Sequence, residues 1–149
     1  MRSVKGVKRG DIIRTHVQYA ATQLIVSTTF AHLERASAQT GPWYRVGYEL
    51  RAETGWWYAE LESGDGDLGA EPATLYHRNL DHVATCPGLV FSVDFDHGVV
   101  RGVVPSSCLQ DPRWVRVNPF ARTWHQFPAT SLDVGHRRGE VAPRIYREP

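Results

Sequence analysis

Two adjacent tryptophans, Trp56 and Trp57, lie inside a stretch of alternating apolar and polar residues, 48-YELRAETGWWYAELESGDGD-67. Neighbouring side chains on a β-strand point to opposite faces of the sheet. One hydrophobic core therefore cannot hold both indole rings. The alternation predicts that Trp57 lies in the core and that Trp56 lies on the opposite, wetter face with Tyr58.

The same stretch predicts an antiparallel hairpin with a two-residue turn at residues 54–55. In this register Ala52 pairs with Trp57, and the apolar faces of both strands coincide. A second alternating run, 89-LVFSVDFDHGVVRGVVP-105, predicts another hairpin with a turn at residues 97–98. That register places Asp94 opposite Arg101 as an ion pair.

The rest of the chain favours strands over helices. The segment LIVSTTF predicts a strand to about Thr29, followed by a short helix or a continued strand. Residues 74–83 fit either a short helix or an edge strand, and the segment WVRV fits a strand. We expect a mainly β, single-domain barrel or sandwich of antiparallel hairpins with little helix and extended N- and C-terminal arms.

The predicted domain organisation has three parts. Residues 1–10 form a basic N-terminal arm, residues 11–127 a β-rich domain, and residues 128–149 a C-terminal arm that contains Pro and Arg. The content of 42% hydrophobic residues and five Trp indicates a folded protein.

Charge is distributed unevenly along the chain. Residues 1–48 carry seven basic and two acidic groups, residues 49–96 two basic and ten acidic, and residues 97–149 eight basic and four acidic. The net charge of +1 is not typical of a nucleic-acid-binding domain. Such blocks fit packing within one chain or head-to-tail contact between copies.

The two cysteines, Cys86 and Cys108, have no CxxC spacing. Reduced thiols in a cytosolic protein are the favoured interpretation, and a disulfide is the alternative. No run of 18 apolar residues is present, and the basic N-terminal stretch is followed by no apolar segment. We therefore expect a cytoplasmic or virion location, and neither a secreted nor a transmembrane protein.

Few side chains in the sequence suggest a catalytic or metal-binding site. Asp94, Asp96 and His97 resemble a metal cluster, although Asp-His-Gly is also ordinary turn chemistry. His77 and His82 are spaced too far apart for one helical face. We predict no metal and no cofactor, and the chain shows no Walker, Rossmann or zinc spacing.

Two resemblances bear on function. The segment 55-GWWYAELESGDGDLGAEPATLY-76 is similar to the second half of an SH3 domain. This resemblance implies that Trp56 and Tyr76 line a groove for proline-rich ligands.

Three fragments resemble, in order, the motifs of trimeric dUTPases: VGYELRA (46–52), GVVPSSCL (102–109) and LDVGHRRGEV (132–141). The resemblance implies nucleotide hydrolysis, with Asp133 as the base that activates water and Ser107 as a phosphate ligand.

Interleaved Arg and aromatic residues in 113-RWVRVNPFARTWHQF-127 fit a protein interface, where Trp, Tyr and Arg are the usual anchors. The predicted interface residues are Trp56, Tyr58, Arg113, Trp114, Arg116, Trp124, Arg137 and Arg138. We expect a non-catalytic structural or interaction protein, a subunit of a larger assembly such as a virus or bacteriophage particle. Its partners would be copies of itself or neighbouring subunits, and the basic arms could contact nucleic acid. The alternatives are a dUTPase-like hydrolase, a basic-armed nucleic-acid-binding protein and an SH3-like module.

Overall fold

The computed structural model describes residues 12–31, 33, 43–63, 67–70, 72–79, 82–124, 131–134 and 142–149. Their elements are β1 (Ile12–Tyr19), β2 (Gln23–Phe30), β3 (Trp43–Ala52), β4 (Gly55–Glu62), β5 (Thr74–His77), β6 (His82–Ala84), β7 (Val90–Asp94), β8 (Val99–Pro105), the 3₁₀ helix η1 (Ser106–Leu109), β9 (Trp114–Trp124), β10 (Ser131–Val134) and β11 (Ile145–Tyr146). None of the described helical residues forms a helix long and apolar enough to cross a membrane. The N-terminal arm at residues 1–10 lies outside the described residues.

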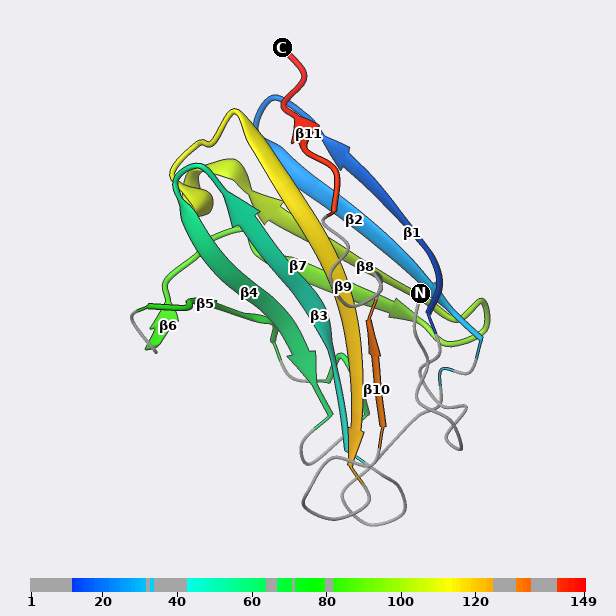
Figure 1. The fold of residues 1–149 in the computed structure, drawn as a ribbon. Coiled ribbons are helices and arrows are strands. Elements are labelled where there is room, and N and C mark those ends of the chain that lie inside the picture. Colours follow the sequence, from blue (N-terminus) through cyan, green and yellow to red (C-terminus); the bar gives the residue numbers. More distant parts are fainter. Residues whose placement is uncertain are drawn as a thin grey trace.

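Two antiparallel sheets form a sandwich, which confirms the predicted mainly β class (Figure 1). The four-stranded sheet has the order β1-β2-β8-β7. The seven-stranded sheet has the order β10-β9-β3-β4-β5-β6, and β11 also pairs with β9. Both sheets are open, so of the two predicted architectures the sandwich is the one formed.

The core lies between the sheets because the strands alternate as their sequences do. In β2 every second residue is buried, from Leu24 to Phe30. In β4 Trp57 is 3% exposed, which confirms its predicted place in the core. Its ring meets that of His77 edge-on, with centroids 5.2 Å apart.

Tyr48 joins the two sheets through the middle of this core. Its ring is fully buried on β3, and its hydroxyl lies 3.0 Å from the Thr28 hydroxyl on β2. The hydroxyl also donates to the carbonyl of Val100 on β8 at 3.4 Å. Burial strongly raises the pKa of the Tyr48 phenol, so the group stays neutral and remains a donor.

The first hairpin forms, but its predicted register is wrong by two residues. Ala52 pairs with Gly55, not with Trp57, and the turn is at residues 53–54. A Cβ on Gly55 would lie 2.7 Å from the Trp57 ring and 2.8 Å from His77 Nε2. Gly55 is therefore a strand residue required for close packing. Because the shift is even, each side chain keeps its predicted face.

The second hairpin also differs by two residues from its predicted register. Its turn spans residues 95–98, and Asp94 lies opposite Val99. Gly98 adopts a φ of +66°, and its carbonyl accepts a bond from the Phe30 amide at 2.8 Å. The predicted ion pair between Asp94 and Arg101 is therefore wrong, since Arg101 faces Ser92.

The structure bears on two segments for which the sequence allowed either a helix or a strand. The first strand region continues to Phe30, and residues 34–40 lie outside the described residues. Of residues 74–83, the described ones favour the edge strand over the helix, since Thr74–His77 forms β5 and His82–Ala84 forms β6 at the edge of the larger sheet.

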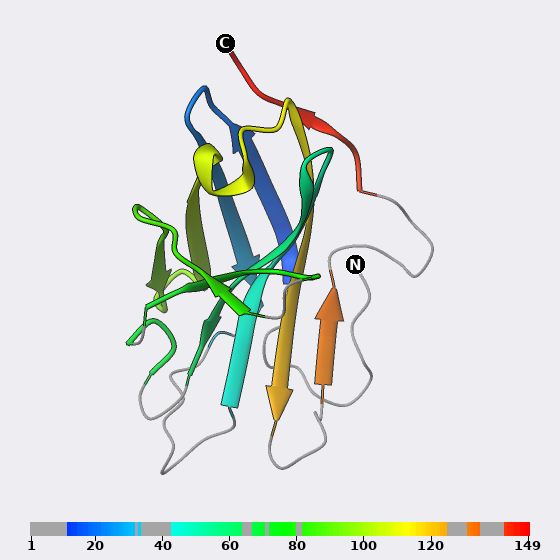
Figure 2. The ribbon, with the colours of Figure 1, turned by 90° about the vertical axis from the view of Figure 1, so that its left-hand side faces the viewer.

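Residues 128–149 contribute two short strands to β9. β10 pairs with residues 120–123 of β9 and β11 with residues 114–115, at opposite ends of the strand (Figure 2, orange and red). Pro119 lies between these two paired regions. Proline has no N–H to donate, so this is a position where a ladder bond is not needed.

Gly47 allows the closest approach of β3 to β4. A Cβ at this position would lie 2.7 Å from the Glu60 Cβ and would contact the Ala59 carbonyl oxygen even more closely. We expect Gly47→Ala to lower the free energy of unfolding by about 1–3 kcal/mol, because overpacking forces the strands apart. Urea unfolding measures this. An unchanged midpoint, with the exposed Ser92→Ala as comparison, would contradict the close packing.

Candidate interaction surface on the seven-stranded sheet

The outward-facing side chains of the seven-stranded sheet form a surface rich in aromatic and arginine residues, here called the outer face. They alternate with the buried residues of the same strands. Its members are Arg45, Glu49 and Arg51 on β3, Trp56, Tyr58, Glu60 and Glu62 on β4, Thr74, Tyr76 and Arg78 on or next to β5, and Trp114, Arg116, Asn118 and Phe120 on β9.

Trp56 lies between two guanidinium groups. The guanidinium carbon of Arg51 lies 3.7 Å from the ring centroid and that of Arg78 lies 3.4 Å from it. Two guanidinium groups this close to one centroid must occupy opposite faces of the ring. Arg51 arrives because it pairs with Trp56 across β3 and β4, and the Arg78 amide donates to the Trp56 carbonyl at 2.9 Å. Trp56 is therefore held as a rigid support for two cations.

Arg116 extends this arrangement across the next strand. It pairs with Arg51 between β9 and β3, so that three arginines and Trp56 lie in one line across the sheet. We call Arg116, Arg51, Trp56 and Arg78 the arginine row. Like charges directly opposite each other on a sheet are destabilising. One carboxylate offsets the repulsion, since Glu49 accepts a bond from Arg51 Nε at 2.8 Å.

Beside the arginine row, two tyrosines stack. The rings of Tyr58 and Tyr76 are 5.3 Å apart at 26°. The Tyr76 hydroxyl donates to the largely buried carboxylate of Glu60 at 3.2 Å, and the Tyr58 hydroxyl donates to Glu49 at 3.4 Å. Burial, with the neighbouring Glu60 charge, raises the pKa of Tyr76 to about 12. Both phenols therefore stay neutral donors at physiological pH.

Two buried polar atoms on the outer face have no hydrogen-bond partner within the described protein. They are Nε1 of Trp56, a donor, and Oδ1 of Asn118, an acceptor. They lie on β4 and β9 with β3 between them, so they cannot satisfy each other. Leaving such a group unpaired costs about 1–3 kcal/mol. Both atoms are covered by the protein itself, so they belong to its own packing.

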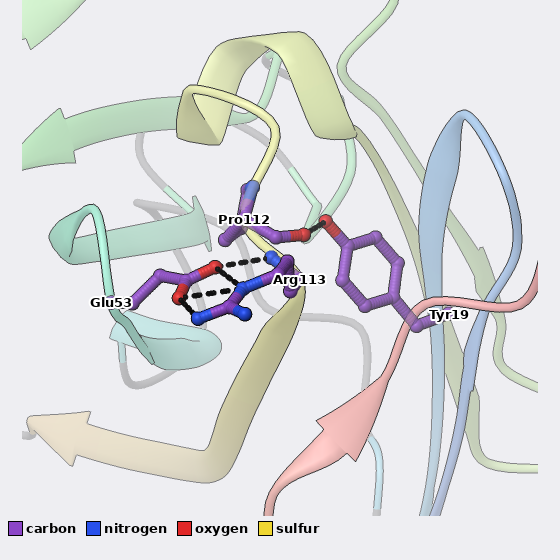
Figure 3. A network of polar contacts seen from close by, with 4 residues as sticks. All are labelled: Tyr19, Glu53, Pro112 and Arg113. Carbon is purple, nitrogen blue, oxygen red and sulfur yellow. Dashed lines mark hydrogen bonds and ion pairs between the residues drawn. The ribbon is translucent and has the colours of Figure 1, made fainter.

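One end of the outer face is fixed by a polar network (Figure 3). Glu53 in the β3–β4 turn accepts bonds from the Arg113 amide at 2.6 Å and from its guanidinium at 2.9 Å. The Tyr19 hydroxyl on β1 donates to the Pro112 carbonyl at 2.6 Å. The Thr54 hydroxyl donates to the carbonyl of Leu109 at 2.7 Å. These contacts hold the turn at residues 53–54 without a glycine.

The structure brings together four of the eight predicted interface residues. Trp56, Tyr58, Trp114 and Arg116 all belong to the outer face, and Arg144 lies 4.3 Å from the Trp114 centroid. Arg113 lies at the edge, paired with Glu53. The side chain of Trp124 and all of Arg137 and Arg138 lie outside the described residues. The sequence analysis missed Arg78, although Arg51 and Arg78 are the only basic residues of the acidic segment 49–96.

The candidate catalytic and metal-binding residues are dispersed. Ser107 is an exposed residue of η1, before β9 begins, whereas Asp133 pairs with Ala121, about 20 Å further along β9 at 3.3 Å per residue. The two are not brought together within one chain. Asp94 binds the amide and the ring nitrogen of His97 within its turn, at 3.1 and 2.7 Å. The described residues contain no group of three metal-ligating side chains.

Cys86 and Cys108 are joined by a disulfide, so the favoured interpretation of reduced thiols is wrong. The bond links the connection between β6 and β7 to η1. Both residues are half-buried and pack against the core cluster that contains Trp57. Disulfides persist in oxidising environments, including virion surfaces, and are rare in the cytosol.

The fold and this surface define a β-sandwich with an aromatic- and arginine-rich sheet face. Comparisons of the chain with protein-family models, curated proteins and solved structures find no match. The SH3-like segment forms part of the larger sheet, and its two predicted groove residues, Trp56 and Tyr76, both lie on the outer face.

Acidification tests the polar network. Hydrogen bonds from Arg113 lower the pKa of Glu53 below its ordinary value of 4.5. A lowered folded-state pKa stabilises the fold above the ordinary value, and this contribution is lost as the pH falls through the folded-state pKa. We expect Glu53→Gln to be less stable than the wild type at about pH 6 and to approach it at about pH 3. Urea midpoints measure this, with the exposed Glu148→Gln as control; a constant gap would contradict the prediction.

Proposed function

We propose that the protein is a non-catalytic structural subunit that associates with copies of itself through the outer face. The observation that carries the proposal is the arrangement of Trp56 between Arg51 and Arg78. Trp, Tyr and Arg are the residue types that most often dominate binding energy at protein interfaces. Here they are gathered on one sheet face that the fold does not use for its own core.

Rigidity favours binding at this face. A free arginine side chain loses rotational entropy when a partner fixes it, at a cost of about 0.5–1.5 kcal/mol. Stacking on Trp56 restricts Arg51 and Arg78 before a partner arrives. The stacked pair Tyr58 and Tyr76 is likewise fixed in advance. Preorganised side chains of this kind raise the affinity for a partner, because less side-chain entropy is lost on binding.

A protein partner fits the outer face better than nucleic acid does. Bases bind aromatic side chains by stacking on a free ring face, and both faces of Trp56 carry a guanidinium. Glu49 and Glu60 would repel phosphates.

The assembly is proposed to be a particle such as that of a virus or bacteriophage. The disulfide between Cys86 and Cys108 supports a location outside the reducing cytosol, as on a virion surface. The charge blocks of the sequence support contacts between oppositely charged parts of neighbouring copies.

The test is the molar mass in solution, measured by light scattering across a concentration series. We expect the wild type to exceed the 16.8 kDa of one chain, with a mass that rises with concentration. Trp56→Ala should shift it toward one chain. Arg101→Ala, on the exposed face of the four-stranded sheet, is the matched control and should leave the mass unchanged. A wild type of one-chain mass at every concentration would contradict self-association.

A further inference from the structure

We propose that the arginine row receives the acidic loop, residues 62–71, of a neighbouring copy. This inference rests on the proposed function and names the segment that fills the outer face. The loop, 62-ESGDGDLGAE-71, contains four acidic residues and no basic one. It is the part of the chain whose charge best complements the three guanidinium groups of the row.

The arginine row has unused binding capacity. Arg51 already contacts Glu49, whereas no carboxylate of the described residues lies within ion-pair distance of Arg78. Arg116 uses one nitrogen, which donates to the Ala142 carbonyl at 3.0 Å. A guanidinium carries five donors in a planar fork that fits a carboxylate with two hydrogen bonds. Arg78 and Arg116 are therefore the positions where carboxylates of a second molecule fit.

The described residues of the acidic loop, 62–63 and 67–70, lie toward the far end of β4 from the arginine row of the same chain. Trp56 is the second residue of β4 and Glu62 is the last, so about 20 Å of extended strand separates them. Leu68 anchors the loop in the core cluster that also contains Leu61, whereas Trp57 belongs to the other cluster. The loop that reaches the arginine row must therefore come from another molecule.

This geometry allows two arrangements, because each copy offers its arginine row at one end of β4 and its acidic loop toward the other end. In a two-fold pair, the row of each copy meets the loop of the other, so the contact is made twice. Made head to tail, the same contact joins copies into rings or open filaments. In either arrangement each copy contributes one row and one loop.

A charge exchange tests the inference in the purified protein. Three variants are compared by light scattering: Arg78→Glu, the pair Asp65→Lys with Glu71→Lys, and a chain that carries all three substitutions. We expect Arg78→Glu alone, and the pair Asp65→Lys with Glu71→Lys alone, each to weaken self-association by about 100-fold. In both variants like charges meet across the contact. The chain with all three should regain part of the association, because opposite charges meet again at residue 78 while Arg116 still faces the reversed loop. Wild-type association should also weaken as salt rises from about 0.1 M to about 1 M.

Matched variants separate the outcomes. Asp94→Lys with Asp96→Lys places the same charge change in the exposed β7–β8 turn and should leave association unchanged; loss there instead would identify that turn as the occupant and overturn the inference. If Trp56→Ala abolishes association while the charge variants have no effect, the acidic loop is not the occupant, although the proposed function stands. A monomeric wild type overturns both. Circular dichroism of every variant confirms that it is folded.

Discussion

Trp57→Ala should lower the free energy of unfolding by about 3–5 kcal/mol, the usual cost of deleting a buried tryptophan side chain. Trp57 is 3% exposed and packs against Gly55 and the edge of His77. Removing it leaves a cavity that the close-packed sheets cannot fill. Trp56→Ala should cost only about 1–2 kcal/mol, because it removes two cation–π contacts at a half-exposed site.

The comparison is informative because the two residues are chemically identical and adjacent. Urea unfolding followed by circular dichroism measures both variants under the same conditions. A destabilisation by Trp56→Ala equal to that of Trp57→Ala would mean that the outward ring belongs to a core. The assignment of Trp56 to a binding surface would then be wrong.

Breaking the disulfide should have the second largest effect on stability. Cys86 and Cys108 are 22 residues apart, and closing a loop of that length stabilises a protein by about 3 kcal/mol. The bond also fixes η1, whose Leu109 carbonyl anchors Thr54 in the β3–β4 turn. We therefore expect the variant Cys86→Ser with Cys108→Ser to unfold at markedly lower urea concentration.

Thiol labelling provides the direct check. The denatured, unreduced protein should react with no thiol reagent, and after reduction it should take up two labels per chain, as read by mass spectrometry. Two labels without reduction would contradict the disulfide. Replacing both cysteines avoids leaving one unpaired thiol, so the loss of stability reports on the bond itself.

The faces of the strands could be predicted from the sequence, whereas their registers could not. Alternation placed Trp57 inside and Trp56 outside because side-chain direction depends only on strand geometry. The turn was expected at residues 54–55, since glycine favours tight hairpin turns. The structure uses Gly55 instead to admit the Trp57 ring, and contacts from Glu53 and Thr54 hold the turn. Those contacts involve residues more than 50 positions away, which local patterns do not report.

The composition of the outer face was only partly predictable. Trp114 and Arg116 were identified from their mixture of aromatic and basic residues, and they reach the face through the pairing of β9 with β3. Arg78 was missed because its stacking on Trp56 requires β5 to pair with β4 across an intervening loop. Strand order is a tertiary property, and neither composition nor periodicity determines it. The partners of β10 and β11 were unpredictable for the same reason.

Nuclear magnetic resonance of the indole groups tests the central claim most directly. The five tryptophans give side-chain Nε1–H signals, and Trp56→Phe and Trp57→Phe assign two of them. Spectra of the ¹⁵N-labelled protein are recorded across a dilution series. If copies meet through the outer face, the Trp56 signal shifts or broadens as concentration rises, while the Trp57 signal in the core stays fixed. A Trp56 signal that is unchanged while the mass increases would place the contact elsewhere and contradict the account.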